Sequence, residues 1–124
     1  MVVKKKVGIA GFGVVGKRRA TFIKNVKELE VVAVCDQSFQ GSGVLSNGVK
    51  YFSDYKELIK QELDILFVCI SNDMAAEVTI SGLESGFHVF CEKPPARNLS
   101  EIEEVLNCER NHPNLRLKYG FNHR

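Results

Sequence analysis

The sequence has no long hydrophobic run and almost no excess charge of one sign. Its longest uninterrupted apolar stretch is Ile65 to Ile70, whereas a membrane-spanning helix needs about 20 such residues. Seventeen Lys and Arg against 15 Asp and Glu give a net charge of +2. So weak a field does not favour nucleic acid or an anionic membrane. We expect neither partner, and the clusters Lys4-Lys5-Lys6 and Lys17-Arg18-Arg19 are interpreted as a solvated rim.

Closely spaced cysteine pairs are also missing. Cys35, Cys69, Cys91 and Cys108 form no C-x-x-C motif, which argues against disulfides and zinc. Three of them end apolar runs, where a reduced cysteine is typically a small buried hydrophobe. The glycine-rich run 7–16 follows three lysines but leads to no small-x-small cleavage site, so it is a poor signal peptide. We therefore expect a cytoplasmic protein with free thiols and no metal.

Apolar, β-branched segments alternate with amphipathic ones along the chain. The predicted strands are residues 7–10, 30–35, 49–52, 65–70, 88–91 and 115–119, and the predicted helices begin near residues 15, 54, 73 and 100. This alternation predicts one α/β domain over residues 1–124, a doubly wound parallel sheet of about six strands covered by helices on both sides. Capping boxes at Asp54–Glu57 and Ser100–Glu103 would begin two helices. The Gly- and Ser-rich segment Gln37–Gly48 is expected to be a loop.

The chemistry-bearing motif with the clearest context is a G-x-G-x-x-G sequence between the first strand and the first helix. It comprises Gly11, Phe12, Gly13, Val14, Val15 and Gly16. Gly11 would make a tight turn, Gly13 would let a pyrophosphate approach the backbone, and Gly16 would let the helix pack closely. The phosphates would then lie on unpaired amides at the helix N-terminus. An ordinary glycine turn is the alternative.

An acidic residue follows at the spacing that a dinucleotide site requires. Asp36 comes directly after the second predicted strand, about 20 residues beyond the motif, where a carboxylate accepts hydrogen bonds from the adenosine ribose. It would repel a 2′-phosphate, and no Lys or Arg follows closely to offset this. We therefore expect NAD rather than NADP, with Gln37 also contacting the cofactor.

A second motif ends the strand at residues 88–91. Glu92-Lys93-Pro94 lies at a strand end, where open α/β sheets bind ligands. A lysine there can donate a hydrogen bond or proton to a substrate oxygen. A surface ion pair is the alternative reading of these residues.

Together with Gly120-Phe121-Asn122-His123-Arg124, these motifs resemble the Gfo/Idh/MocA oxidoreductase family over essentially the whole chain. The resemblance implies a Rossmann domain and an NAD(P)-dependent oxidation or reduction of a hydroxyl or carbonyl group. It further implies that Lys93 is catalytic and lies beside the nicotinamide. Ser71, Asn72, Glu92, Asn122 and Arg124 would complete the cofactor site.

The sequence departs from the family pattern in three places. Ser71-Asn72 stands where the family often has Thr-Pro, and Pro95 replaces an aliphatic residue. The family's second α/β domain, which contacts substrate, is absent from these 124 residues. We therefore expect the cofactor-binding half of a dehydrogenase acting on a sugar-like or nucleotide-sugar substrate, with homo-oligomers expected. A non-catalytic dinucleotide sensor and the Rossmann half of a different two-domain dehydrogenase remain as alternatives.

Overall fold

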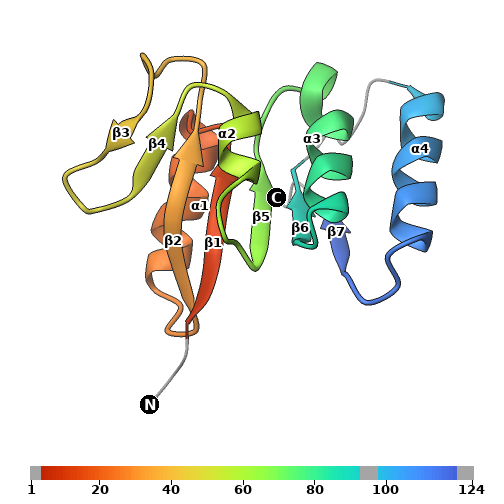
Figure 1. Cartoon of the computed structure of the whole chain (residues 1–124), viewed down its shortest axis with the longest axis horizontal. Coiled ribbons are helices and arrows are strands. Elements are labelled where there is room, and N and C mark those ends of the chain that lie inside the picture. Colours follow the sequence, from red (N-terminus) through yellow and green to blue (C-terminus); the bar gives the residue numbers. More distant parts are fainter. Residues whose placement is uncertain (1–3, 93–97, 120–124) are drawn as a thin grey trace, which may run out of the picture.

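The computed structural model describes residues 4–92 and 98–119, in which a single seven-stranded sheet is flanked by four helices (Figure 1). The strands are β1 Lys5–Ala10, β2 Leu29–Cys35, β3 Gly43–Val44, β4 Lys50–Phe52, β5 Ile65–Val68, β6 His88–Cys91 and β7 Leu117–Tyr119, and the helices are α1 Val14–Lys24, α2 Tyr55–Ile59, α3 Asn72–Glu84 and α4 Leu99–Arg110. The strand order is β3-β4-β2-β1-β5-β6-β7. The predicted doubly wound α/β fold is confirmed.

Strands β1, β2 and β5 bury side chains on both faces of the sheet, since successive side chains of a strand point to opposite sides. On one face, Val7 and Ile9 of β1 pack with Ile23 of α1. On the other face, Ala10 belongs to a cluster with Leu58 of α2 and with residues of α3 and α4. Helices therefore cover both sides, as the alternation of apolar strands and amphipathic segments predicts.

The count of about six strands is too low, because β3 lies within the segment that we expected to be a loop. β3 pairs antiparallel with β4, so the sheet is not wholly parallel. Leu45 and Val49 close the connection through a 2.8 Å backbone hydrogen bond, and Gly48 has φ +89. Asn-Gly is a strong hairpin signal because both residues tolerate tight turns. Asn47-Gly48 could therefore have identified this hairpin.

Two helix starts show how side chains replace missing backbone partners. The Asp54 carboxylate accepts a 2.9 Å hydrogen bond from the N–H of Lys56 and caps α2, as expected. The cap of α4 is Asn98, whose side-chain oxygen accepts a 3.0 Å hydrogen bond from Glu101 N–H. The prediction of Ser100 as the cap is wrong by two residues. Asn and Ser are comparably good caps, so the local sequence alone did not decide between them.

Without β3, the parallel strands have the order of a dinucleotide-binding sheet, and the direction of winding reverses between β1 and β5. A crevice forms outside the carboxyl ends of the strands at such a reversal. The β1–α1 turn, Asp36 after β2, Ser71 after β5 and Glu92 after β6 all belong to this edge of the sheet. The topology therefore gathers the predicted site residues that the structure describes.

Candidate functional site

The turn between β1 and α1 is built around Gly11. Gly11 has φ +94, a conformation that L side chains rarely adopt, and its N–H donates a 2.8 Å hydrogen bond to the Cys35 carbonyl. A Cβ at this position would lie 2.5 Å from the carbonyl oxygen of Cys69. The turn therefore fits tightly between the ends of β2 and β5, and only glycine suits it.

The other two glycines of the motif have opposite surroundings. A Cβ on Gly16 would lie 1.9 Å from the Gly11 carbonyl oxygen, so α1 begins in direct contact with the turn itself. A Cβ on Gly13 would have no heavy atom within 4 Å. Gly13 is the N-cap of α1 and supplies no side-chain cap. The amides at the start of α1 are thus reached through open space, as an approaching anion requires.

Val14 and Val15 form the first turn of α1 and are 74% and 40% exposed, respectively. A valine side chain brings neither charge nor hydrogen-bonding groups to the helix start, so it does not compete for the backbone amides. The positive end of the helix dipole is therefore left without an acidic side chain in the first turn.

Asp36 connects the end of β2 with the glycine turn. One carboxylate oxygen accepts a 2.6 Å hydrogen bond from Phe12 N–H, and the other accepts a 2.9 Å bond from Ser38 N–H. Burial acts to raise the pKa of Asp36. The hydrogen bonds from Ser38 and Phe12 and the Lys17 ammonium outweigh burial and hold the pKa below its ordinary value. The side chain is therefore a fixed, ionised acceptor at the crevice.

Lys17 lies closer to this carboxylate than the order of residues suggests. It stands on α1, its ammonium is 5.9 Å from the centre of the Phe12 ring, and its charge lowers the pKa of Asp36. The Phe12 ring in turn stacks on Phe39 at 6.2 Å between centroids. The sequence prediction considered only basic residues that follow Asp36, so it missed this one from the preceding helix.

A pocket of about 450 Å³ opens beside Asp36 and the exposed residue Gln37. Its other walls come from the ends of β4 and β5 and from α2 and α3, and include Ser53, Tyr55, Ile70 and Met74. The sequence prediction identified none of these four as site residues. Because β4 and β5 end at the same edge as β2, knowledge of the strand order would have identified them.

The second half of the crevice lies at the ends of β5 and β6. Ser71 is the N-cap of α3, and its hydroxyl donates a hydrogen bond to the Asp73 carboxylate. Asn72 begins α3, and its side chain lies outside the described part of the structure. The Glu92 N–H donates a 2.9 Å hydrogen bond to the Val68 carbonyl, which fixes Glu92 beside β5. Lys93, Asn122 and Arg124 lie outside the described residues.

Arg19 does not belong to the solvated rim in which the sequence prediction placed it. Its guanidinium pairs with the Glu92 carboxylate, and its central carbon lies 5.1 Å from the Phe90 ring centre. The rim interpretation suits Arg18, which is exposed. No signal in the sequence separates these adjacent arginines, because the partners of Arg19 are about 70 residues away.

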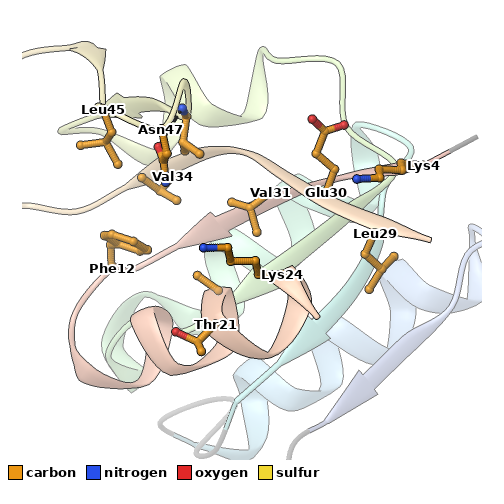
Figure 2. A pocket seen from close by; sticks show the side chains of 12 residues that line it. Lys4, Phe12, Thr21, Lys24, Leu29, Glu30, Val31, Val34, Leu45 and Asn47 are labelled. Carbon is orange, nitrogen blue, oxygen red and sulfur yellow. Dashed lines mark hydrogen bonds between the residues drawn. The ribbon is translucent and has the colours of Figure 1, made fainter. Parts of the chain in front are cut away.

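A separate groove of about 330 Å³ lies between α1 and β2 (Figure 2). Thr21 and Lys24 of α1 line one wall, Val31 lies on the floor, and Leu45 and Asn47 come from the β3–β4 connection. The groove runs along a face of the sheet and not across the strand ends. Phe12, which also lines this groove, connects it with the glycine turn beside Asp36.

All four cysteines are free; Cys35 and Cys91, which end apolar strands, are buried, and so is Cys108, whereas Cys69 is only partly buried. Burial is the main cause that raises the pKa of Cys35 to about 11 and that of Cys69 to about 12, so neither thiol is an activated nucleophile. Across residues 4–92 and 98–119, no group of three His, Cys, Asp or Glu side chains is arranged to hold a metal ion. None of the helices in the described part of the chain is long and apolar enough to span a membrane.

The strand order, the glycine turn and the oriented acidic residue define a dinucleotide-binding domain of the Rossmann class. The sequence model of the Gfo/Idh/MocA family, described as an oxidoreductase family with an NAD-binding Rossmann fold, matches residues 5–121. The chain therefore belongs to this family, as the resemblance implied.

Relatives of known activity agree with this assignment. The chain is 30% identical over 122 residues to inositol 2-dehydrogenase of Salmonella typhimurium, covering 94% of this chain and 36% of the relative. It is 33% identical to D-glucoside 3-dehydrogenase of Escherichia coli, covering 96% and 35%. Scyllo-inositol dehydrogenase of Lactobacillus casei, solved with NAD(H) and scyllo-inositol, superposes with a TM-score of 0.81 at 26% identity, covering 94% and 36%. The chain thus spans about a third of these relatives.

Proposed function

We propose that this chain is the cofactor-binding part of an NAD-dependent dehydrogenase acting on a polyol or sugar hydroxyl. The observation that carries the proposal is the hydrogen bond from Phe12 to Asp36, because it places an ionised acceptor directly beside a glycine turn that is open to an anion. A solvated loop aspartate would not need this arrangement.

The described residues fit the cofactor that the family implies. Open space at Gly13 and the uncapped amides of α1 suit the pyrophosphate, since both provide direct access to backbone donors. Asp36 retains acceptor capacity for the two ribose hydroxyls after its two backbone hydrogen bonds. The pocket beside it, with Ile70 and Met74 in its walls, suits the adenine ring.

When bound, NAD supplies the hydride acceptor or donor of the reaction. The role of the protein is to hold both reactants at the carboxyl ends of β5 and β6. It must also donate a proton to the substrate oxygen or accept one from it. We propose that Lys93 hydrogen-bonds that oxygen, and that Ser71, Asn72, Glu92, Asn122 and Arg124 contribute to the same half of the site. General acid–base groups of this kind contribute about 10²–10⁴-fold to a rate.

We propose that the whole protein acts on a cyclic polyol or a glycoside, because relatives named for inositols and a D-glucoside share this domain. A nucleotide sugar is the second candidate, on the resemblance of residues 120–124 to that branch. The substrate-binding domain would lie outside these 124 residues, and we propose a cytoplasmic location. Assay of the whole protein with inositols, glucosides and nucleotide sugars distinguishes these substrates.

The decisive test of this proposal is calorimetric titration of the 124-residue chain with NADH and, separately, assay of dehydrogenase activity. We expect NADH binding without turnover, since hydride transfer needs a substrate held about 3–3.5 Å from the cofactor. Failure to bind NADH would refute the proposal. Turnover by the 124-residue chain alone would refute the need for a second domain. A whole protein that binds NADH but has no dehydrogenase activity would favour the alternative function, a non-catalytic dinucleotide sensor.

We further propose that the chain associates with a second copy of itself. An apolar surface over β5 and β6 includes the partly exposed side chains of Ile65 and Phe90, and no helix of the described residues covers it fully. Phe22 on α1 is 58% exposed and lies one turn from Arg19, which contacts Phe90. Contiguous apolar patches of this kind rarely remain bare. A strictly monomeric chain in light scattering at high concentration would contradict this association.

A further inference from the structure

We propose that Arg19 is a positioning residue that holds the Glu92 carboxylate at the end of β6 and thereby strengthens binding of the nicotinamide half of the cofactor. The proposal rests on the function proposed above. It concerns a residue that neither sequence motif contains and that reaches the site through Glu92.

Three contacts fix the geometry around Arg19. Its Nε donates to a Glu92 carboxylate oxygen, and its guanidinium carbon lies over the Phe90 ring, 5.1 Å from the ring centre. Phe90 stacks in turn on Phe67 of the neighbouring strand, with 5.1 Å between ring centres. A planar guanidinium can stack and donate at the same time, which an ammonium cannot do equally well. The arrangement is therefore specific for arginine.

The ion pair between Arg19 and Glu92 is partly shielded from water, so its loss should have a measurable energetic cost. The side chains of Arg19 and Glu92 are 31% and 16% exposed, respectively, so both lie partly out of water. Fully exposed ion pairs contribute little, but removal of one partner from a shielded pair leaves the other charge uncompensated. Without Arg19, the Glu92 carboxylate would turn towards water or stand unpaired near an anionic cofactor.

The position of Glu92 identifies which half of the cofactor is affected. Asp36 follows β2 on one side of the reversal between β1 and β5, whereas Glu92 follows β6 on the other side. Each half of such a sheet binds one mononucleotide. Since Asp36 suits the adenosine ribose, the nicotinamide half falls to the ends of β5 and β6.

Arg19 also joins the two halves mechanically. It stands on α1, whose first amides suit the pyrophosphate, and it reaches the strand end that suits the nicotinamide. A movement of α1 relative to β6 would therefore have to break the ion pair and the ring contact together. If Arg19 served only to anchor α1, its loss would weaken binding of any ligand that uses the glycine turn.

The test compares NADH with ADP, which has the adenosine and both phosphates but neither the second ribose nor the nicotinamide. We expect Arg19→Met to weaken NADH binding about tenfold and to leave ADP binding within about twofold, measured by calorimetry. Arg18→Met is the matched control, because it makes the same change in net charge on the adjacent exposed residue. It should leave both affinities near those of the parent.

Glu92→Gln keeps the shape of the side chain but removes its charge. It should weaken NADH binding, relative to binding of the ligand that lacks nicotinamide, by the same factor as Arg19→Met. The double variant should be no worse than either single one, since both remove the same interaction. Equal losses for both ligands, or an unchanged NADH affinity, would overturn the positioning role. If Arg19→Met does not fold, Glu92→Gln decides by the same comparison. A parent chain that binds neither ligand would instead overturn the proposed function, and this inference with it.

Discussion

The Asp36 carboxylate accepts a 2.6 Å hydrogen bond from the backbone N–H of Phe12, so a side chain from the end of β2 fixes the second residue of the glycine motif. If Asp36 binds the ribose and the glycine turn binds the pyrophosphate, as proposed, this hydrogen bond connects the two parts of the cofactor site. A change at Asp36 should affect both the choice of cofactor and the shape of the turn.

Asp36 should set the preference for NADH over NADPH. Its ionised carboxylate would repel a 2′-phosphate, so Asp36→Ser should narrow the preference and Asp36→Arg should reverse it. Titration of each variant with both cofactors measures this. Asp64→Ser is a matched control, because the Asp64 carboxylate also accepts a backbone hydrogen bond, of 2.7 Å from Lys6, but lies at the opposite edge of the sheet. Equal or stronger NADPH binding by the parent chain would contradict the prediction.

Stability should depend on the ionisation of Asp36. Because its pKa is lowered in the folded chain, its stabilising contribution is fully present above the ordinary aspartate pKa of about 3.9 and is lost as the pH falls through the lower, folded-state value. Asp36→Asn should therefore lower the free energy of unfolding at pH 7, and the difference from the parent should shrink below about pH 4. Urea unfolding at a series of pH values measures both. A difference that does not change with pH would show that packing, not charge, is responsible.

Substitution of the second and third glycines of the motif, Gly13 and Gly16, should have different effects. Gly16→Ala would force a Cβ against the Gly11 carbonyl, so we expect a large fall in melting temperature. Gly13→Ala meets no protein atom within 4 Å, so the fold should survive. Its methyl group would occupy the path of the pyrophosphate and weaken NADH binding by about tenfold or more. Thermal unfolding and calorimetry separate these effects, and normal NADH binding by Gly13→Ala would place the phosphates elsewhere.

The cap of α4 offers a test of the structure that is independent of function. Asn98→Ala should cost about 1 kcal/mol of stability, the usual effect of losing an N-cap, because it removes the acceptor for Glu101 N–H. Ser100→Ala, two residues further along the chain, should lower the free energy of unfolding by less than Asn98→Ala does. The reverse order in denaturant unfolding would favour the capping box at Ser100.

Sequence patterns predicted the features that depend on local rules. The glycine turn at Gly11 and the cap at Asp54 need only a few neighbouring residues, and the structure shows both where expected. The alternation of buried strands and helices likewise follows from the hydrophobic pattern, so the fold class could be predicted from the sequence.

The features that sequence reasoning missed depend on distant partners. Arg19 and Arg18 are equivalent in the sequence, and only the packing of α1 against β6 brings Arg19 to Glu92. Tyr55 and Met74 reach the pocket beside Asp36 because β4 and β5 end next to it, which requires the strand order. The hairpin at Asn47-Gly48 was missed for another reason. Its sequence signal is local, but the high glycine content of the segment led us to predict a loop instead.

The central position of β1 has a consequence for synthesis of the chain. β1 emerges before both of its neighbours, pairs with β2 on one side, and can pair on the other side only when β5 has been made. At about 5–20 residues per second, the interval between the ends of these two neighbours is roughly 2–7 s. During that time the backbone hydrogen-bonding groups of β1 that later pair with β5 have no permanent partner, so we expect the nascent chain to be most vulnerable to chaperone capture and aggregation in this interval.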